Sequence, residues 1–171
     1  MSDRPTSSRI YLLRHARAAW PQAGSRDFDR ALDADGRDEA DRIGLAMAIN
    51  GYVPKKVLCS TARRCVETWD LVGRHLRVAD VTMADGLYAS DHHFYVDQLR
   101  EQNEPSVLVI GHNPMMDDTA ICLLSRANGN EHFPEHGFPT AGLAIIDLEG
   151  PPSGAGKAPG HLVGFLTPHD T

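Results

Sequence analysis

The sequence is poor in cysteine and has no long hydrophobic run. Its three cysteines among 171 residues, Cys59, Cys65 and Cys122, form no C-x-x-C pair and leave an odd one, so neither a disulfide framework nor a zinc ribbon is indicated. No apolar stretch approaches the roughly 20 residues of a membrane helix, and the N-terminus MSDRPTSSR lacks the apolar core of a signal peptide. We therefore expect a cytoplasmic protein that is not exported.

The sequence also lacks an excess of basic residues. It has 17 lysines and arginines against 23 aspartates and glutamates, which gives a formal net charge of -6. This balance argues against a general electrostatic attraction to nucleic acid or to anionic lipid, so we expect neither nucleic acid nor a membrane as a partner. Any site for an anion must therefore be local.

What the sequence does contain is a series of short apolar runs, as expected of strands that are covered on both faces. These runs span residues 10–13, 57–59, 107–110 and 143–148. Helical patterns lie between or beside them, at 32–51, 64–76, 91–102 and from Pro114 onward.

The alternation of strand and helix predicts βαβ units. We therefore predict the α/β class, a three-layer α/β/α sandwich with a mostly parallel sheet. Residues 142–148 and 161–166 read as two strands joined by a Gly- and Pro-rich loop, which predicts an antiparallel hairpin at the C-terminal edge of the sheet. The length and the 42% hydrophobic content fit a single domain over 1–171, with residues 1–8 as a flexible N-terminus.

Three of the predicted strands end in polar side chains. The first is followed by Arg14 and His15, the second by Ser60 and Arg64, and the third by His112. Because ligands of open α/β sheets bind outside the carboxyl ends of the strands, we expect these residues to converge on one crevice. The two arginines indicate that its ligand is an anion.

The starts of two helices point to the same crevice. Asn113 can act as an N-cap with Pro114 at the first helical position, and Ser60 and Thr61 precede the helix that carries Arg64. Helix N-termini add unpaired N–H groups and partial positive charge. Because an arginine can bind two phosphate oxygens at once, a phosphoryl group suits this arrangement better than a carboxylate.

Catalysis in this crevice needs a nucleophile. The sequence has no activated-cysteine motif, no G-x-S-x-G elbow and no P-loop. A neutral histidine can attack phosphorus and hold a covalent intermediate that water later hydrolyses. Arg14, Arg64 and a second histidine are the groups that can stabilise charge on the equatorial oxygens of the transition state.

Three motifs carry a family resemblance: Arg14-His15-Ala16 after a strand, Ser60-x-x-x-Arg64-x-x-x-Thr68, and Gly111-His112-Asn113-Pro114. Together they resemble the histidine phosphatase superfamily, which has the phosphoglycerate mutase-like fold. The short length, the DFDRAL segment at 27–32 and Leu87-Tyr88 are most similar to its small SixA-type branch, the phosphohistidine phosphatases. Ala16 replaces the usual glycine of the first motif.

The resemblance implies that His15 is the nucleophile that becomes phosphorylated. It also implies that Arg14, Arg64 and His112 bind the phosphoryl group around it. The fold that it implies is an α/β/α sandwich, and the reaction that it implies uses no metal or other cofactor.

The general acid of the family has no clear equivalent in this sequence. Larger members place an acidic residue over the leaving group, and the candidates here are Asp85, just before Gly86, and Asp27 and Asp29 in the loop after the first motif. A phosphohistidine can lose a protonated imidazole, which is a far better leaving group than an alkoxide. The missing acid therefore favours P–N donors over phosphate monoesters and over mutase activity.

Several other polar residues are candidates for the edge of the site. We expect phosphate contacts from Arg17, Ser60 and Asn113, with Arg30 and Thr140 as further candidates. Ser60 is a cap or a supporting donor rather than a nucleophile, because no base is arranged around it. Arg63 is expected in solvent or at the rim.

A metal site is not expected. His132 and His136 have zinc-finger spacing, and His92 and His93 are adjacent, but no cysteine pair or H-E-x-x-H motif accompanies them.

The sequence thus predicts a metal-independent phosphatase of SixA type that forms a phosphohistidine intermediate. Its expected substrate is phosphohistidine on a protein, such as a carrier or a histidine phosphotransfer domain. The alternatives are a phosphatase of small phosphomonoesters and a module that binds phosphorylated protein without turnover. The presence of His15, both arginines and His112 argues against the second alternative.

Overall fold

The computed structural model describes residues 5–124 and 133–170. The elements follow one another as β1 (Ser7–Arg14), η1 (Asp27–Asp29), α1 (Ala34–Ile49), β2 (Lys56–Ser60), α2 (Arg63–Val72), β3 (Asp80–Ala84), α3 (Gly86–Ala89), α4 (His92–Arg100), β4 (Ser106–Gly111), α5 (Met115–Leu123), β5 (Leu143–Glu149), η2 (Pro152–Gly154) and β6 (His161–Leu166), where η denotes a 3-10 helix. Every predicted strand and helix is present, with ends that differ from the prediction by a few residues.

All six strands form one sheet in the order β3-β2-β4-β1-β5-β6. Strands β1 to β4 run parallel, whereas β5 is antiparallel to β1 and β6 is antiparallel to β5. The mostly parallel sheet and the C-terminal edge hairpin are therefore confirmed. In the register of β1 and β4, Arg14 lies opposite Gly111, so the segments that follow these two strands start side by side.

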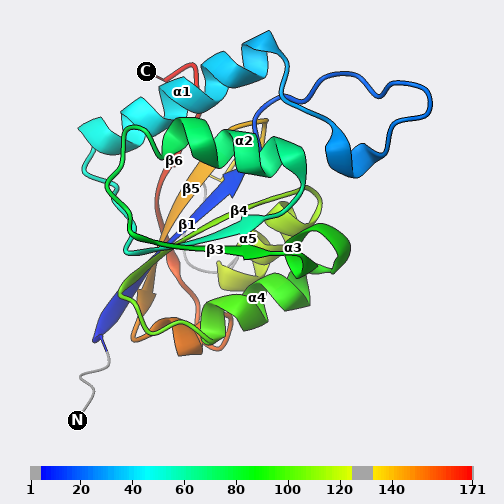
Figure 1. The fold of residues 1–171 in the computed structure, drawn as a ribbon. Helices are drawn as coiled ribbons and strands as arrows, with labels where there is room; N and C mark the ends of the chain where they lie inside the picture. The colour runs from blue at the N-terminus through cyan, green and yellow to red at the C-terminus, as the bar shows by residue number, and fades with distance from the viewer. Residues whose placement is uncertain (1–4, 125–132, 171) are drawn as a thin grey trace.

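Helices cover both faces of the sheet (Figure 1). Helices α1 and α2 lie on one face, and α3, α4 and α5 lie on the other. In β1, Tyr11 and Leu13 pack into the core between the sheet and helices α1 and α2. Ile10 and Leu12 pack into the core between the sheet and helices α3, α4 and α5. Side chains alternate between the faces of a strand, so burial on both sides requires the uninterrupted apolar run seen in the sequence. The three-layer α/β/α sandwich is confirmed.

The first strand begins earlier than predicted. Ser8 is only 4% exposed, and its hydroxyl donates a hydrogen bond to the carbonyl oxygen of Gly150 at 2.8 Å. The expectation of a flexible N-terminus over 1–8 is therefore wrong for Ser7 and Ser8, which pair with β5. Residues 1–4 lie outside the described residues.

Besides the two 3-10 helices, one strand and one α-helix have no counterpart in the prediction. Strand β3 is at the edge of the sheet and its residues are exposed or half-buried, so it has no apolar run to reveal it. Helix α3 has four residues, which is too short for a helical periodicity. Both precede α4 in the chain, and α3 carries Tyr88.

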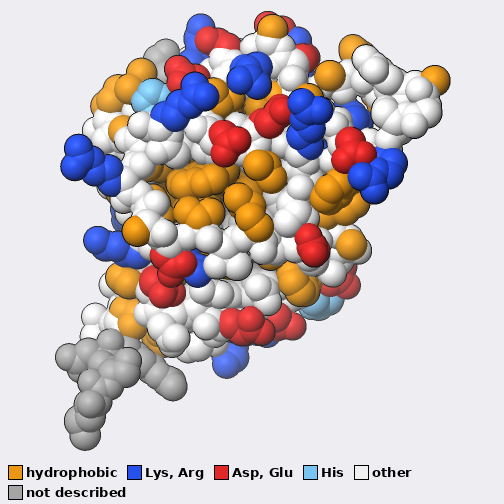
Figure 2. Space-filling model, viewed as in Figure 1, with side chains coloured by type: hydrophobic (Ala, Val, Ile, Leu, Met, Phe, Trp, Pro, Cys, Tyr) orange, Lys and Arg blue, Asp and Glu red, His pale blue; other side chains and the backbone are white. Residues whose placement is uncertain are grey.

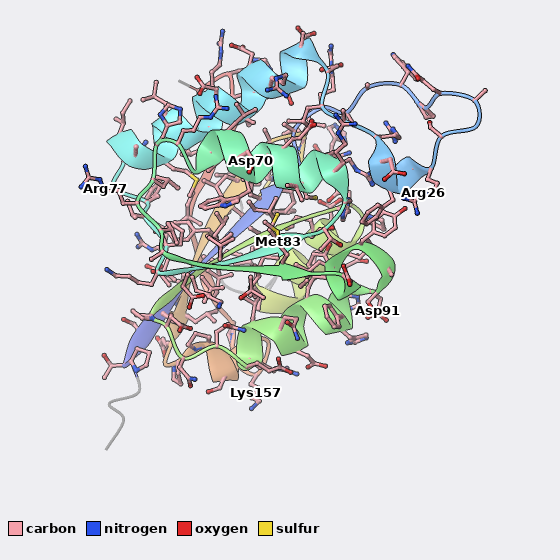
Figure 3. All side chains as sticks on the ribbon, viewed as in Figure 1. Arg26, Asp70, Arg77, Met83, Asp91 and Lys157 are labelled. Carbon is pink, nitrogen blue, oxygen red and sulfur yellow. The ribbon has the colours of Figure 1, made fainter. Side chains whose placement is uncertain are left out.

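The face shown in Figure 2 carries acidic and basic side chains next to one another, with no extended basic area. Apolar side chains gather on this face between α2 and β3. Met83 of β3, labelled in Figure 3, is 43% exposed. In the described part of the chain, no helix combines the length and the apolar character that a membrane crossing requires.

Candidate active site

The polar residues at the ends of three strands lie together, as predicted. His15 follows β1 and His112 follows β4, and the backbone N–H of His15 donates to the carbonyl oxygen of Gly111 at 3.0 Å. The two imidazole rings are 5.2 Å apart between centroids. Ser60 ends β2, and Arg64 lies in the first turn of α2. All four of these side chains are buried, with exposed fractions of 9% or less.

The tautomer of His15 follows from its hydrogen bonds. Its Nδ1 lies 2.8 Å from the carbonyl oxygen of Ala16, and Arg64 Nε donates to its Nε2 at 3.2 Å. Because a carbonyl only accepts, Nδ1 carries the proton and Nε2 presents a lone pair. Burial, together with the charges of the nearby cations, lowers the pKa of His15 to about 3. At neutral pH the side chain is therefore an uncharged imidazole whose unprotonated Nε2 accepts from Arg64.

His112 has the opposite tautomer. Arg64 Nη2 lies 3.2 Å from its Nδ1, which must accept, and its Nε2 lies 2.8 Å from the Ser60 hydroxyl oxygen. Burial and the adjacent Arg64 charge lower the pKa of His112 to about 4. Ser60 therefore holds the ring of His112, and its predicted direct contact with phosphate stays a prediction.

Arg64 lies at the centre of the site. Besides the two histidines, its guanidinium contacts Asp27, donating from Nη1 to the backbone carbonyl at 2.9 Å and from Nη2 to Oδ2 at 3.2 Å. Thr68, one helical turn further along α2, fixes the turn after His15. Its hydroxyl accepts from the backbone N–H of Ala16 at 3.0 Å and donates to the carbonyl oxygen of Arg64 at 2.7 Å.

Arg14 supplies a second guanidinium, half-buried at the end of β1. Its Nη1 donates to the carbonyl oxygen of Phe138 at 2.7 Å. Its Nε is buried and has no hydrogen-bond partner among the described residues. Since an unpaired buried N–H is costly, this donor favours an anionic acceptor from a ligand.

Asn113 does not cap helix α5, which corrects the sequence prediction. The helix begins at Met115 with no side-chain cap, and the Asn113 amide instead donates to Asp117 Oδ2 at 3.1 Å and to the Phe138 carbonyl oxygen at 3.3 Å. The Asp117 Oδ1 also accepts from the backbone N–H of Phe138 at 2.8 Å. These bonds hold the loop that orients Arg14.

The three candidate acids occupy different environments. The Asp27 side chain accepts a hydrogen bond from Arg64. Asp85 accepts from the Thr61 hydroxyl at 2.7 Å, and Asp29 pairs with Arg26 at 2.7 Å. Figure 3 shows Arg26 beside η1, on the side of the molecule that carries α3. The hydrogen bond from Arg30 and the charge of Arg64 lower the pKa of Asp27.

Tyr88 is a site residue that the sequence reasoning did not single out for a role. Its hydroxyl donates to Asp27 Oδ2 at 3.1 Å, and its ring lies 5.5 Å from that of His112 and 5.0 Å from that of Phe28. The Arg64 guanidinium lies 5.9 Å from the centroid of the same ring. The only signal for it in the sequence was the Leu87-Tyr88 pair of the family resemblance.

The remaining predicted cations have partners of their own. Arg17 pairs with Asp33 and Asp35, so a role in phosphate binding requires it to leave two carboxylates. Arg63 is exposed and pairs with Glu67 on the surface of α2, as the expectation of a solvated or rim position requires.

Two more candidates lie on the connections around the site. Arg30 donates to the carbonyl oxygen of Ala19 and to Asp27, and so reaches the site through Asp27. The Thr140 hydroxyl donates to Glu39 at 3.1 Å, and the next residue, Ala141, donates its backbone N–H to the His15 carbonyl oxygen.

The predictions about metals stay predictions. His132 lies outside the described residues, so its spacing to His136 has no structural counterpart. Within 5–124 and 133–170, no three histidine, cysteine, aspartate or glutamate side chains are grouped so as to hold a metal ion.

Comparison with known proteins gives the family. The family model of the histidine phosphatase superfamily (branch 1) matches residues 10–91. The SixA protein of Agrobacterium tumefaciens, known as a crystal structure, is 35% identical with a TM-score of 0.82, over 94% of this chain and 97% of that one. The uncharacterized protein Rv1276c of Mycobacterium tuberculosis is 31% identical, over 91% of this chain and 99% of its own length.

A further solved structure, the protein histidine phosphatase SixA complexed with tungstate, has a TM-score of 0.77 at 22% identity, over 95% of this chain and 98% of that one, and so shares the fold. The match to the Agrobacterium protein spans nearly the full length of both chains. The chain therefore belongs to the histidine phosphatase superfamily and, within it, to the SixA type.

Proposed function

We propose that this chain hydrolyses phosphohistidine on a protein, with His15 as the nucleophile. The observation that carries the proposal is the state of the His15 ring. Its Nδ1 is bonded to the Ala16 carbonyl oxygen, and its Nε2 faces the Arg64 guanidinium with a lone pair. A neutral imidazole among fixed cationic donors is the arrangement that phosphoryl transfer to nitrogen requires.

The roles of the other residues follow from their donors. Arg64 and Arg14 would bind the equatorial oxygens, Arg14 through the Nε that has no partner among the described residues. His112 would bind as a donor, because a phosphate dianion raises the pKa of an adjacent histidine and favours protonation of Nδ1. Charge that develops on the phosphoryl oxygens is then met by groups already in place.

The second step returns the enzyme to its starting state. Water attacks the phosphorus atom of phosphorylated His15, the N–P bond breaks, and its electron pair returns to Nε2. Inorganic phosphate leaves, and the hydrogen bond from Nδ1 to Ala16 keeps the ring in the same orientation for the next turnover.

The substrate class is inferred from the acids at the rim. The pKa of Asp27 is lowered, so its carboxylate is not a ready proton donor, and Asp85 accepts a hydrogen bond from the Thr61 hydroxyl. An alkoxide leaving group needs a proton from the enzyme, whereas the imidazole of a phosphohistidine leaves with its own. This difference favours a P–N bond over a phosphomonoester. The identity of the partner protein and a cytoplasmic location stay predictions.

Phosphate release from a phosphohistidine-bearing protein tests the proposal. With EDTA present, wild type should release phosphate and His15→Ala should not, while His169→Ala, at an exposed C-terminal histidine, should match wild type. Parallel assays on sugar phosphates distinguish a small-molecule phosphatase, which would prefer them. Tight phosphate binding with no turnover on any substrate would identify a binding module.

A further inference from the structure

The carboxylate of Asp27 is fixed at the rim of the site by donors from three segments. Arg30, at the end of η1, donates to Oδ1 at 3.0 Å, and Oδ2 accepts from Arg64 of α2 at 3.2 Å and from Tyr88 of α3 at 3.1 Å. Through Arg64, whose Nε contacts His15 Nε2 at 3.2 Å, Asp27 is held in a constant relation to the nucleophile.

This carboxylate keeps capacity for one more hydrogen bond. A carboxylate offers about four acceptor positions, and among the residues that the structure describes Arg30, Arg64 and Tyr88 occupy three. The side chain is nevertheless 52% exposed, so a group that enters from solvent can reach it. The edge-to-face rings of Phe28 and Tyr88, 5.0 Å apart, lie beside it and offer apolar surface to an aromatic ring.

Asp27 is an acceptor in this setting and not an acid. The bond from Arg30, followed by the charge of Arg64 and the bond from Tyr88, lowers its pKa, so it holds no proton at neutral pH. A phosphohistidine supplies the complementary donor. One of its ring nitrogens bears the phosphoryl group, and the other, when protonated, points an N–H away from phosphorus.

We propose that Asp27 is a catalytic residue that accepts a hydrogen bond from the protonated ring nitrogen of the phosphohistidine substrate. The inference rests on the proposed function and assigns the leaving-group side of the same site. It explains how the chain works without a general acid, because the carboxylate holds a proton that the substrate already carries.

The transfer step balances without any proton donated by the enzyme. The lone pair of His15 Nε2 forms the new N–P bond while the substrate N–P bond breaks. The electron pair of the broken bond stays on the leaving nitrogen, and the remote nitrogen keeps its proton against Asp27. The ring therefore departs as neutral imidazole.

The contribution of Asp27 to the rate should increase as the pH rises above the pKa of the substrate ring. An adjacent carboxylate favours the protonated ring, which is the form that leaves as a neutral molecule. Below the ring's own pKa the substrate is protonated without help, so Asp27 matters little there. Above it, Asp27 keeps the bound substrate in the reactive form.

The test compares Asp27→Asn with Asp29→Asn, the same change two residues along the same 3-10 turn, where the carboxylate pairs with Arg26 at the surface. The kcat/KM for a phosphohistidine protein and for p-nitrophenyl phosphate, whose leaving group has no ring N–H, is measured from pH 5.5 to 9. For Asp27→Asn on phosphohistidine, the alkaline limb should move down by about one pH unit, which corresponds to roughly a ten-fold loss at pH 8.5.

The same variant should lose much less on p-nitrophenyl phosphate at that pH, and Asp29→Asn should follow wild type on both substrates. An equal loss on both substrates at every pH would overturn the inference, because Asp27 would then only position Arg64. The proposed function stands in that case as long as His15→Ala is inactive. A wild type that does not act on phosphohistidine overturns both.

Discussion

At the scale of single residues, the site is defined by which nitrogen of each histidine carries the proton. The carbonyl oxygen of Ala16 fixes the proton of His15 on Nδ1, and the hydroxyl oxygen of Ser60 accepts a hydrogen bond from the Nε2–H of His112. Arg64 faces the two unprotonated nitrogens. One guanidinium therefore donates to the unprotonated nitrogen of each ring. A phosphoryl group that binds here would take the place of Arg64 as the partner of these two nitrogens.

Arg64 and Arg63 offer a matched pair of adjacent arginines. Arg64→Lys keeps the charge but loses the planar fork that reaches both histidines, and we expect kcat/KM to fall by roughly 100-fold. Arg63→Lys changes only a surface pair with Glu67, and we expect kcat/KM within about two-fold of wild type. Steady-state kinetics on a phosphohistidine protein measures both. Equal losses in the two variants would show that Arg64 has no special role.

The two buried histidines also predict how stability depends on pH. Their pKa values are lowered from 6.5 to about 3 for His15 and about 4 for His112, so between roughly pH 4 and 6.5 the unfolded chain binds protons that the native protein does not. The free energy of unfolding should therefore fall as pH falls through this range, by up to about 1.4 kcal/mol per pH unit for each histidine.

Urea unfolding at pH 7.5, 6 and 5 measures this dependence. His15→Asn removes one of the two groups and should make the fall less steep, whereas His169→Asn, at an exposed position, should leave it unchanged. A slope that is the same in wild type and in His15→Asn would mean that His15 is already protonated in the native protein.

At the scale of elements, the turn after β1 is held against the start of α1 by close backbone approach. A Cβ on Gly36 would lie 1.9 Å from the carbonyl oxygen of Arg17, which the backbone cannot accommodate without moving. The same carbonyl oxygen accepts from the backbone N–H of Asp33, the N-cap of α1. The start of helix α1 therefore holds in place the loop that begins at Arg17, two residues after His15.

Gly36→Ala is therefore expected to destabilise the protein by roughly 3 kcal/mol, the upper part of the range for overpacking. Gly154→Ala is the control, because no atom lies within 4 Å of its added Cβ, and it should unfold within about 1 kcal/mol of wild type. Chemical denaturation compares the two. A Gly36→Ala variant as stable as the control would contradict the close packing of this turn.

The elements also show where the sequence was informative. Strands β1, β2, β4 and β5 are buried on both faces, so their apolar runs were visible, and so were the helices with a buried face. Strand β3 has only exposed and half-buried residues, and α3 has one buried residue in a single turn, so neither left a pattern. The N-cap of α5 was misassigned to Asn113, because its side-chain amide donates to Asp117 and Phe138, which no local pattern reveals.

The residues of the site also differ in how far the sequence could predict their positions. His15, Ser60 and His112 stand at ends of buried strands, and the parallel order of those strands brings them together. The positions of Asp27 and Tyr88 depend on a long loop and a one-turn helix that pack on each other. Their contact is tertiary, so it could be found only in the structure.

At the scale of the whole molecule, the order of the strands in the sheet brings the residues of the site together. The parallel pairing of β4 with both β1 and β2 gathers groups from positions 14 to 112 at one edge. The antiparallel β5 and β6 complete the sheet on the far side of β1, and residues just before β5 meet the site through Ala141 and Gly142. Because the formal net charge of the chain is -6, the attraction of an anion to the guanidiniums of Arg14 and Arg64 is local.

The most direct measurement is the position of the phosphoryl group on the enzyme. Wild type mixed with a phosphohistidine protein is quenched in alkali during turnover, and the phosphorylated residue is identified by peptide mapping and phosphorus NMR. We predict one phosphoryl group, on Nε2 of His15, because Nδ1 is bonded to the Ala16 carbonyl oxygen. A phosphoryl group on Nδ1 or on another residue, or turnover with no phosphoenzyme in a rapid quench, would contradict this mechanism.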